Sequence, residues 1–235
     1  MGFFRDMISV FTKKELSFIE SRQEAEGVYT FLFEKDRDLV WMAGQYGLFT
    51  IAHRNVKPAT KPFSIASAPG ENVVRITTRI GDNPSDYKKA LLELQKGMTI
   101  KMGGPVGKFV LQGDSPSLLI AGGIGITPFR AILKQIEAEG RRGGQQISLL
   151  YMDSDKVYIG KDELDEMASR AAITITYLDS RDDLHQEIGK FADLHKNDGQ
   201  YFIAGPKSMV DSVAAHLQSR QIPKPNIKKD AFWGY

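Results

Sequence analysis

The segment from Leu118 to Pro128 constrains the fold more than any other stretch of this chain. Its first residues, Leu118 to Ala121, form an apolar run that is too short for a helix and typical of a buried parallel strand. Three glycines follow closely and let the backbone turn sharply, because no side chain stands in the way. We expect Thr127 to cap the next helix and Pro128 to lie in its first turn. A strand, a glycine turn and a helix in this order present backbone N–H groups to a phosphate.

A phosphate site is not the only interpretation of this segment. Glycine-rich turns also occur in α/β proteins for purely structural reasons. The segment departs from the G-x-G-x-x-G fingerprint of Rossmann folds, because Pro128 stands where the third glycine is expected. A structural turn and a phosphate-binding turn therefore both stay open, and the rest of the sequence has to decide between them.

The chain divides near residue 113 into two regions with different patterns. Before it, short β-rich runs bounded by Gly, Pro or Asn predict an antiparallel barrel or sandwich, with one helix at 84–94 capped by Asn83 or Ser85. After it, strands at 117–121, 146–152, 172–178 and 200–204 alternate with helices at 127–139, 161–169, 185–194 and 206–219. That alternation predicts an α/β domain with a parallel sheet. We therefore expect domains at 1–113 and 114–235.

The composition narrows the class of protein. The net charge of +2 gives no reason to expect nucleic acid binding, and no apolar run reaches the roughly 20 residues of a membrane span. The absence of cysteine excludes disulfides, a cysteine-ligated iron–sulfur cluster and a thiol nucleophile. The four histidines show no metal-binding spacing, so no metal site is expected. Residues 1–11 lack the apolar core of a secretion signal, so we expect a cytoplasmic protein.

The segment from Lys61 to Ser67 carries residue types suited to cofactor binding. It puts a cation, an aromatic ring and hydroxyls on one expected strand. Because alternate residues of a strand face the same side, Lys61 and Phe63 share a face and Ser64 takes the other. Taken alone, these residues are better explained as a solvated charge and a barrel core.

Two further turns stand out. The residues from Gly104 to Phe109 predict a rigid turn that enters the next strand. The residues from Ile203 to Met209 predict a second strand-to-helix turn in the parallel domain, with Pro206 at the first helical position. The parallel domain is therefore expected to carry two such turns.

Taken together, the order and spacing of these segments resemble the ferredoxin–NADP reductase superfamily of two-domain flavoprotein reductases. That resemblance implies a flavin-binding antiparallel β-barrel followed by an NAD(P)-binding α/β domain with a parallel sheet. Members carry an Arg-x-Tyr/Phe-Ser/Thr motif on a barrel strand, and Lys61, Phe63 and Ser64 stand at its positions. By resemblance, Lys61 meets the flavin pyrophosphate, Phe63 packs on the flavin, and Ser64 hydrogen-bonds near its N5 atom. The other flavin contacts that it implies are Tyr46, Pro62 and Ser85.

The same resemblance assigns the parallel domain to the nicotinamide cofactor. The turn at 122–128 is similar to the NAD(P) pyrophosphate loop, and the turn at 204–206 is similar to a Cys-Gly-Pro turn beside the nicotinamide. Ser180 and Arg181 resemble a pair that holds the 2′-phosphate of NADPH. Asp153 and Asp155 instead favour a free 2′-hydroxyl, so both donors stay open, with NADPH slightly favoured. The implied contacts are Gly123, Gly125, Thr127, Pro128, Ser180, Arg181, Ala204, Gly205, Pro206 and Met209.

The chain ends in an aromatic segment, which is unusual for a frayed terminus and indicates that it docks on something. By resemblance, Phe232 and Trp233 approach the flavin or its adenine, so that the tail returns to the flavin. Tyr235 is then a catalytic residue together with Ser64. These aromatic side chains could equally cover a hydrophobic patch.

Two residues depart from the pattern of the superfamily. Lys61 replaces the usual arginine, and an ammonium cannot make the planar bidentate contact of a guanidinium with phosphate. Ala204 replaces the usual cysteine beside the nicotinamide. We therefore expect weaker flavin binding, and either slower hydride transfer or a differently placed nicotinamide.

The activity implied by the resemblance is an FAD-dependent oxidoreductase. Hydride passes from NADPH or NADH to the flavin, and electrons then pass to a separate acceptor. Because the chain has no cysteine for a cluster, that acceptor is expected to be a ferredoxin, a flavodoxin, a partner enzyme or a diffusible oxidant. Two alternatives stay open: a reductase of free flavin or ferric chelates, and a non-catalytic flavin-binding regulatory subunit.

Overall fold

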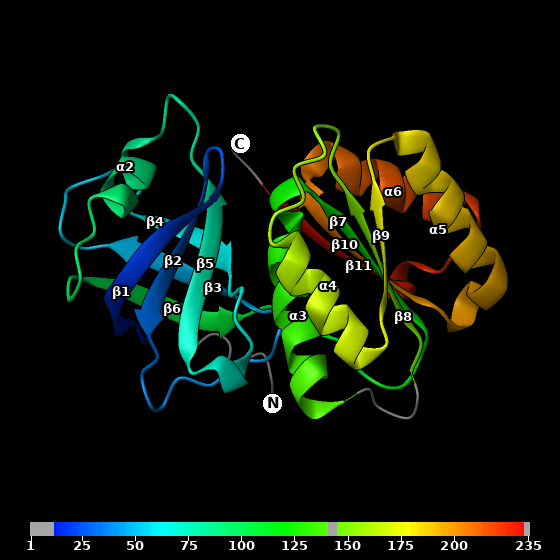
Figure 1. Cartoon of the computed structure of the whole chain (residues 1–235), viewed down its shortest axis with the longest axis horizontal. Coiled ribbons are helices and arrows are strands. Elements are labelled where there is room, and N and C mark those ends of the chain that lie inside the picture. The colour runs from blue at the N-terminus through cyan, green and yellow to red at the C-terminus, as the bar shows by residue number, and fades with distance from the viewer. Residues whose placement is uncertain (1–11, 141–144, 233–235) are drawn as a thin grey trace. The chain divides into compact units, whose positions relative to one another are not determined.

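The computed structural model describes residues 12–140 and 145–232 (Figure 1). The chain divides into two compact units, Met1–Val110 and Leu111–Tyr235, each with its own sheet and its own apolar core. The first sheet is antiparallel and the second is parallel. The expected fold class, an antiparallel barrel followed by an α/β domain, is confirmed.

The first unit is built on a six-stranded sheet with the strand order β4-β3-β6-β1-β2-β5. Its strands bury alternate side chains, as in β3, where Gly47, Phe49 and Ile51 are buried. Register shifts in β1 and between β3 and β6 bend the sheet. The strands are β1 (Lys14–Ala25), β2 (Val28–Glu34), β3 (Tyr46–Ile51), β4 (Thr60–Ser64), β5 (Val73–Arg79) and β6 (Thr99–Val106), with a short 3-10 turn, η1 (Pro69–Glu71), before β5.

Hydrogen bonds join the two edge strands of this sheet and close it into a barrel. Just beyond β4, Ala66 N donates to Arg75 O of β5 at 2.8 Å. The Ser67 hydroxyl accepts from Arg75 N at 3.0 Å and donates to Val73 O at 2.7 Å. Trp41 Nε1 donates to Ser67 O at 2.9 Å from the loop before β3. These bonds satisfy backbone groups that an open sheet edge would expose.

The α-helix that the structure describes in the first unit is α2 (Asp86–Leu92). Ser85 caps it, as expected, since its hydroxyl accepts from Lys88 N at 3.5 Å. The helix contributes three buried side chains to the barrel core, among them Tyr87. The Tyr87 hydroxyl donates to Phe49 O at 3.0 Å, so α2 is fixed to β3 by both apolar packing and a hydrogen bond.

The second unit is built on a five-stranded parallel sheet with the order β11-β10-β7-β8-β9. Helices α3 and α4 cover one face, and α5 and α6 cover the other (Figure 1). The strands are β7 (Ser117–Gly122), β8 (Ile147–Met152), β9 (Thr174–Leu178), β10 (Gln200–Pro206) and β11 (Ile227–Phe232). The helices are α3 (Ile126–Glu139), α4 (Lys161–Ala171), α5 (Arg181–His195) and α6 (Lys207–Ser219), and the 3-10 turns are η2 (Gly123–Gly125), η4 (Lys196–Asp198) and η5 (Lys224–Asn226).

The central strands of this sheet are largely apolar because both of their faces are covered. All six residues of β7 are buried. Side chains of α5 and α6 pack on one face of the sheet in a continuous apolar cluster that includes Ile120, Ile203, Ile188 and Leu217. This two-sided burial explains why the run from Leu118 to Ala121 shows no polar alternation.

The C-terminal segment forms a strand that the sequence patterns did not predict. Residues 227–232 pair with β10 in parallel, with Ala204 opposite Asp230 and Pro206 opposite Phe232. Two lysines and an aspartate occupy this strand, as is common at sheet edges, and they hide its β pattern. The aromatic segment therefore docks on β10, as far as the described residues extend. Trp233 and Tyr235 lie outside them.

Among the element boundaries that differ from those expected, three have a clear structural cause. Strand β4 ends at Ser64 rather than Ser67, because the chain turns there to bond with β5. The expected turn at Gly104 to Phe109 begins later, because β6 continues to Val106, which pairs with Tyr46. Helix α5 begins at residue 181 rather than 185, because a serine caps it early. Part of the turn predicted from Gly104 to Phe109 therefore belongs to strand β6 of the barrel.

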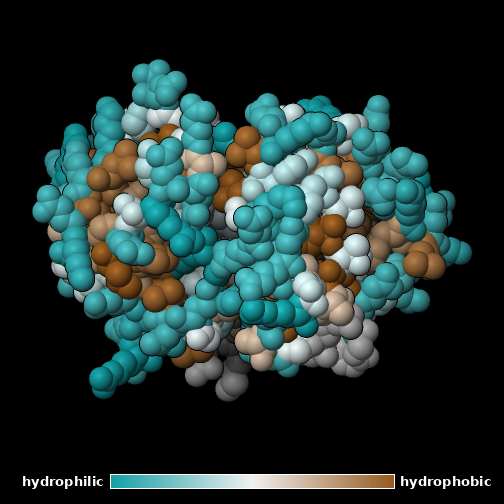
Figure 2. All heavy atoms as spheres, in the orientation of Figure 1, coloured by the Kyte–Doolittle hydropathy of each residue, from teal (hydrophilic) through white to brown (hydrophobic). Residues whose placement is uncertain are grey.

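The surface agrees with the ordinary composition of the chain. Polar and charged side chains cover most of the face drawn in Figure 2, between scattered apolar patches. Among the described residues, no helix is both long and apolar enough to cross a membrane. The large apolar side chains that are exposed are Val40, Met42, Leu92, Val157 and Leu194.

Candidate functional site

Two glycine turns lie side by side at the carboxyl edge of the parallel sheet. Strands β7 and β10 are neighbours and run in parallel, with Ala121 opposite Ala204. The chain leaves β7 through η2 into α3, and it leaves β10 directly into α6. The carboxyl edge of an open parallel sheet is the usual place for a ligand in α/β proteins. The structure thus brings the two turns predicted from the sequence together.

The two turns are in direct backbone contact because they contain glycine. A Cβ atom on Gly125 would lie 2.2 Å from Ala204 O and 2.7 Å from Gly205 Cα. A Cβ atom on Gly205, whose φ is +150°, would lie 3.0 Å from Gly122 O. The two distances at Gly125 are shorter than real Cβ contacts, and at Gly205 a tight contact is combined with a φ that side chains rarely adopt. Gly125 and Gly205 are therefore required for packing, whether or not a ligand binds.

Gly123 is the glycine of the turn that packing does not explain. Its φ is +52°, it is partly exposed, and the nearest atom to an added Cβ is Asp153 Oδ2, at 3.7 Å. An exposed backbone in this left-handed conformation, directly before a helix, offers N–H groups to an anion. The residues present therefore fit a dinucleotide pyrophosphate at this end of the turn.

Two predicted roles at the helix starts are wrong. The Thr127 hydroxyl does not cap α3 but donates to Ile124 O at 3.1 Å, and the N-cap residue is Gly125. The reason is that η2 already winds the chain before α3, so Thr127 lies inside the first turn. Pro206 is the N-cap residue of α6 rather than its first helical residue. Pro128 does lie in the first turn of α3, as expected.

Ala204 and Met209 pack within the unit. Ala204 is completely buried in β10. An added Cβ on Gly122 would lie 2.1 Å from Met209 Sδ, so this side chain fills the space beside the glycine turn. Contact of either residue with a nicotinamide stays a prediction.

An acidic loop follows β8 beside the glycine turn. Asp153 is buried, and its Oδ1 accepts from Asp155 N at 3.0 Å and from Val157 N at 3.2 Å. One carboxylate oxygen thus holds its own loop, while the other faces Gly123. Asp155 is exposed. Sequence reasoning considered both acids for the cofactor but missed the structural role of Asp153.

Ser180 and Arg181 lie at the start of α5, directly after β9. The Ser180 hydroxyl accepts from Asp183 N at 3.3 Å and caps the helix. Arg181 is exposed, and no carboxylate among the described residues lies within 4.0 Å of its guanidinium. Nearby, Lys156 Nζ lies 2.6 Å from Asp179 Oδ2, and this contact holds the pKa of the Asp179 carboxyl below its usual range. Arg181 is therefore available to an external anion.

The residues predicted for the flavin converge in the barrel. Tyr46 and Ser64 are opposite each other on β3 and β4. Phe63 stacks on Tyr87 of α2, with ring centres 5.9 Å apart, and Lys61 Nζ lies 5.7 Å from the centre of the same Tyr87 ring. The expectation that Lys61 and Phe63 share a face is confirmed. Ser64 is buried, Pro62 is exposed, and Tyr46 is half-buried.

Sequence reasoning missed Lys88 at this site. It lies on α2, three positions after the cap Ser85 and therefore on the same side of the helix. Burial lowers the pKa of Lys88, and the nearby charge of Lys61 lowers it further. Two cations and two aromatic rings together fit a flavin that carries a pyrophosphate. The spacing of three residues between Ser85 and Lys88 on a predicted helix was the sequence signal that could have identified Lys88.

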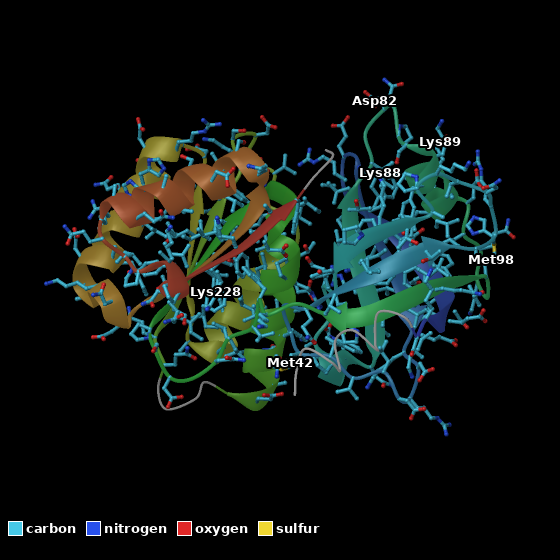
Figure 3. The ribbon with its side chains drawn as sticks, turned by 180° about the vertical axis from the view of Figure 1, so that it is seen from behind. Met42, Asp82, Lys88, Lys89, Met98 and Lys228 are labelled. Carbon is cyan, nitrogen blue, oxygen red and sulfur yellow. The ribbon has the colours of Figure 1, made fainter. Side chains whose placement is uncertain are left out.

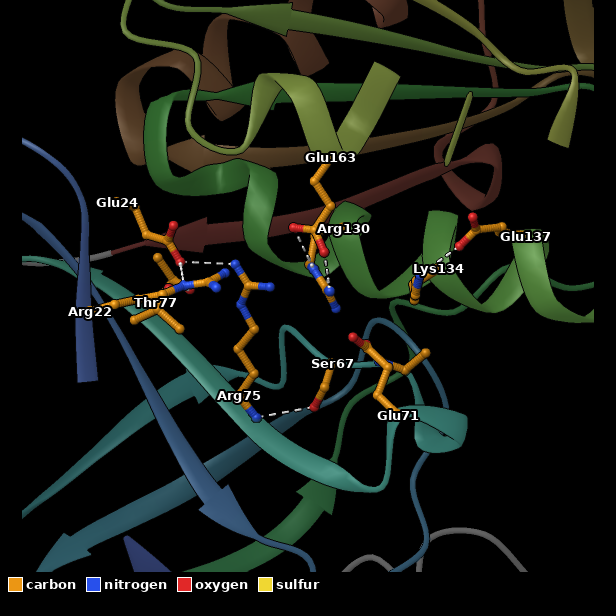
Figure 4. A network of polar contacts seen from close by, with 12 residues as sticks. Arg22, Glu24, Ser67, Glu71, Arg75, Thr77, Arg130, Lys134, Glu137 and Glu163 are labelled. Atoms are coloured by element: carbon orange, nitrogen blue, oxygen red, sulfur yellow. Dashed lines mark hydrogen bonds and ion pairs between the residues drawn. The ribbon is translucent and has the colours of Figure 1, made fainter. Parts of the chain in front are cut away.

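Each unit also contains a buried arginine in an ion pair (Figure 4). In the barrel, Arg75 Nη2 lies 3.0 Å from Glu24 Oε1. In the second unit, Arg130 of α3 donates from Nε to Glu163 Oε2 of α4 at 3.3 Å. Because Arg130 lies in the second turn of α3, its ion pair fastens the helix that begins at the glycine turn. Both are structural contacts that motif reasoning does not reveal.

Comparison with known proteins agrees with this geometry. Residues 119–215 match the family described as oxidoreductase NAD-binding domain. The chain is 24% identical to the 2-halobenzoate 1,2-dioxygenase electron transfer component of Burkholderia cepacia, over 87% of this chain and 62% of that protein. It is also similar to the ferredoxin-NADP+ reductase from Plasmodium falciparum, with a TM-score of 0.79 and 19% identity over 95% of this chain and 97% of that chain.

Residues 119–215 therefore match an oxidoreductase NAD-binding domain, and the chain as a whole has the fold of the ferredoxin-NADP+ reductases. A further structure of the same fold is a flavohemoglobin from Malassezia yamatoensis with bound FAD and heme, with a TM-score of 0.73 and 18% identity over 94% of this chain and 60% of that chain. The chain spans about six-tenths of the length of the curated relatives that it matches first.

Two side chains depart from the motif pattern of the family that the sequence resembles. Lys61 stands in place of the arginine of the flavin motif, and Ala204 stands in place of the cysteine before Gly205. No group of three or more potential metal ligands occurs within residues 12–140 and 145–232. The two departures, at Lys61 and Ala204, fall at positions that the resemblance assigns to cofactor binding.

The packing role of Gly125 predicts a large effect on stability. Gly125→Ala should lower the free energy of unfolding by about 3 kcal/mol, because the new methyl group overlaps the backbone of β10. Gly81→Ala is the control, since nothing lies within 4 Å of its Cβ position. Urea unfolding followed by circular dichroism measures both. Equal midpoints for the two variants would contradict the packing role.

The role of Asp153 predicts local loosening. Asp153→Ala should speed hydrogen exchange at the Val157 amide about tenfold, because a bond to a charged acceptor worth about 1.5 kcal/mol is lost. Asp155→Ala should leave this rate near the wild-type value, since the Asp155 side chain is exposed. Exchange followed by NMR tests this, and slow exchange in both variants would refute it.

Proposed function

We propose that this chain is an FAD-dependent NAD(P)H oxidoreductase that passes electrons to a separate acceptor. The observation that carries the proposal is the exposed Gly123 backbone at the carboxyl edge of a parallel sheet, within the segment that matches the NAD-binding family. In this proposal the barrel, within residues 1–113, binds FAD. The α/β unit, within 114–235, binds the nicotinamide cofactor.

When bound, the flavin supplies the redox chemistry, accepting hydride from the nicotinamide and passing electrons onward. Lys61 neutralises charge on the flavin pyrophosphate, and the ring of Phe63, held by Tyr87, supports the flavin. The Ser64 hydroxyl and Tyr46 contact the flavin from adjacent positions on β4 and β3. Ser85 positions the first turn of α2 beside the pyrophosphate.

On the nicotinamide side, the backbone around Gly123 binds the pyrophosphate and Arg181 binds a 2′-phosphate. The turn from Ala204 to Pro206 borders the nicotinamide, and Phe232 reaches the same edge because it pairs with Pro206. The availability of Arg181 favours NADPH as the donor, with NADH as the alternative. In this proposal Trp233 approaches the flavin or its adenine, and Tyr235 is a catalytic residue together with Ser64. Both Trp233 and Tyr235 lie outside the described residues.

The acceptor is proposed to be a protein such as a ferredoxin, a flavodoxin or a partner oxygenase. Support comes from the relative that is an electron transfer component of a dioxygenase, and from the ferredoxin-NADP+ reductase of the same fold. A second candidate function is the reduction of free flavin. Lys61 favours it, because a lysine holds phosphate less tightly than a bidentate arginine. Bound flavin would then exchange with free flavin, as a reductase of free flavin requires.

The proposed function predicts a defined optical response. Protein incubated with FAD and then freed of unbound flavin should be yellow, and this colour should bleach anaerobically on addition of NADPH or NADH. Steady-state assays with ferredoxin and with free flavin then separate the two candidate acceptors. A protein that stays colourless with added FAD would exclude the proposal.

The choice of donor depends on Arg181. Arg181→Ala should lower the ratio of kcat/KM for NADPH over that for NADH about tenfold, because a charged contact to the 2′-phosphate is lost. Lys190→Ala is the matched control, since Lys190 is an exposed cation on the same helix that pairs with Glu187. A ratio that does not change in Arg181→Ala rules out this role.

A further inference from the structure

A pair of lysines without carboxylate partners lies at the flavin motif. Lys61 is half-buried on β4, with its ammonium above the ring of Tyr87. Lys88 is half-buried on α2, next to Tyr87 in sequence. Among residues 12–140 and 145–232, no carboxylate oxygen lies within 4.0 Å of either ammonium. The site therefore holds two positive charges that the described chain does not neutralise.

The next lysine on α2, Lys89, differs from Lys88 in exposure and in having a carboxylate partner. Lys89 is exposed, and its Nζ lies 3.4 Å from Asp86 Oδ1, so its charge is paired and solvated. Lys88 and Lys89 project from the same short helix (Figure 3). Lys88 instead follows Tyr87, whose ring centre lies 5.7 Å from the Lys61 ammonium, and burial together with the charge of Lys61 lowers the pKa of Lys88. Two like charges that are partly withdrawn from water are unfavourable unless an anion binds between them.

We propose that Lys88 joins Lys61 in binding the pyrophosphate of FAD and replaces the second contact that an arginine would make. This inference rests on the proposed function, because it takes FAD to be the ligand of the barrel. A guanidinium binds two phosphate oxygens with one side chain, whereas an ammonium acts as a point charge. Two ammonium groups on β4 and α2 together match the two negative charges of the diphosphate.

The surroundings position the Lys61 ammonium and the backbone of Lys88 before a ligand arrives. The Lys61 ammonium lies over the Tyr87 ring, which is itself fixed by a hydrogen bond to Phe49 O. The backbone of Lys88 is held by the cap Ser85. Because the Lys61 ammonium already lies over the Tyr87 ring, little of its side-chain freedom remains to be lost on binding. The pair is thus arranged to compensate for the missing arginine.

The test is the dissociation constant of FAD, measured by fluorescence quenching on protein stripped of flavin. Lys88→Met should weaken FAD binding about tenfold, whereas Lys88→Arg, which keeps the charge, should stay within about twofold of wild type. Lys89→Met should not change the constant. The slope of log Kd against log salt should also become shallower in Lys88→Met, because one charge fewer contacts the ligand.

Lys88→Gln is measured in parallel, so that a folding defect of the methionine variant does not decide the result. An FAD affinity in Lys88→Met and Lys88→Gln equal to that of wild type would overturn the inference. So would an unchanged salt slope, or a Lys88→Arg variant as weak as Lys88→Met. If wild type itself binds no FAD, the proposed function fails, and this outcome is distinct from failure of Lys88 alone.

Discussion

The contact between two stretches of bare backbone, at Gly125 and at Ala204–Gly205, is the constraint on which the carboxyl edge of the parallel sheet depends. It lets α3 and α6 start side by side from neighbouring strands. A single methyl group at Gly125 would force the two turns apart. Gly122, Gly125 and Gly205 are thus packed against their neighbours, whereas Gly123 has space around its backbone. The anion site proposed at Gly123 depends on a turn that is packed on one side and bare on the other.

This division among the glycines shows how far motif reasoning extends. The strand, the turn and the helix at 118–128 were predictable from apolar runs and glycine spacing. The function of each glycine was not, because it depends on which strand lies next to β7. Likewise Thr127 satisfies the pattern of a cap, but the preceding 3-10 turn moves it into the helix. Local sequence cannot reveal a contact made by residues about 80 positions away.

Charge patterns limited the prediction in other places. Strand β11 was missed because Lys228, Lys229 and Asp230 suit a sheet edge and hide the β pattern. The motif at Lys61 and Phe63 was predicted correctly as a shared face, since strand alternation alone decides it. Lys88 and Tyr87 come from a helix 24 or more residues further on, and only the fold brings them to β4. The candidate site is therefore predictable strand by strand, but its assembled chemistry is not.

The stacking of Tyr87 on Phe63 has a consequence for recognition. Tyr87 is buried, hydrogen-bonded to β3 and in contact with both Phe63 and Lys61, so this one side chain restricts the motion of two others. The loss of rotational freedom in these groups accompanies folding of the barrel rather than arrival of a ligand. An aromatic surface of this kind favours rigid planar molecules and discriminates against flexible ones by entropy, before any specific hydrogen bond forms.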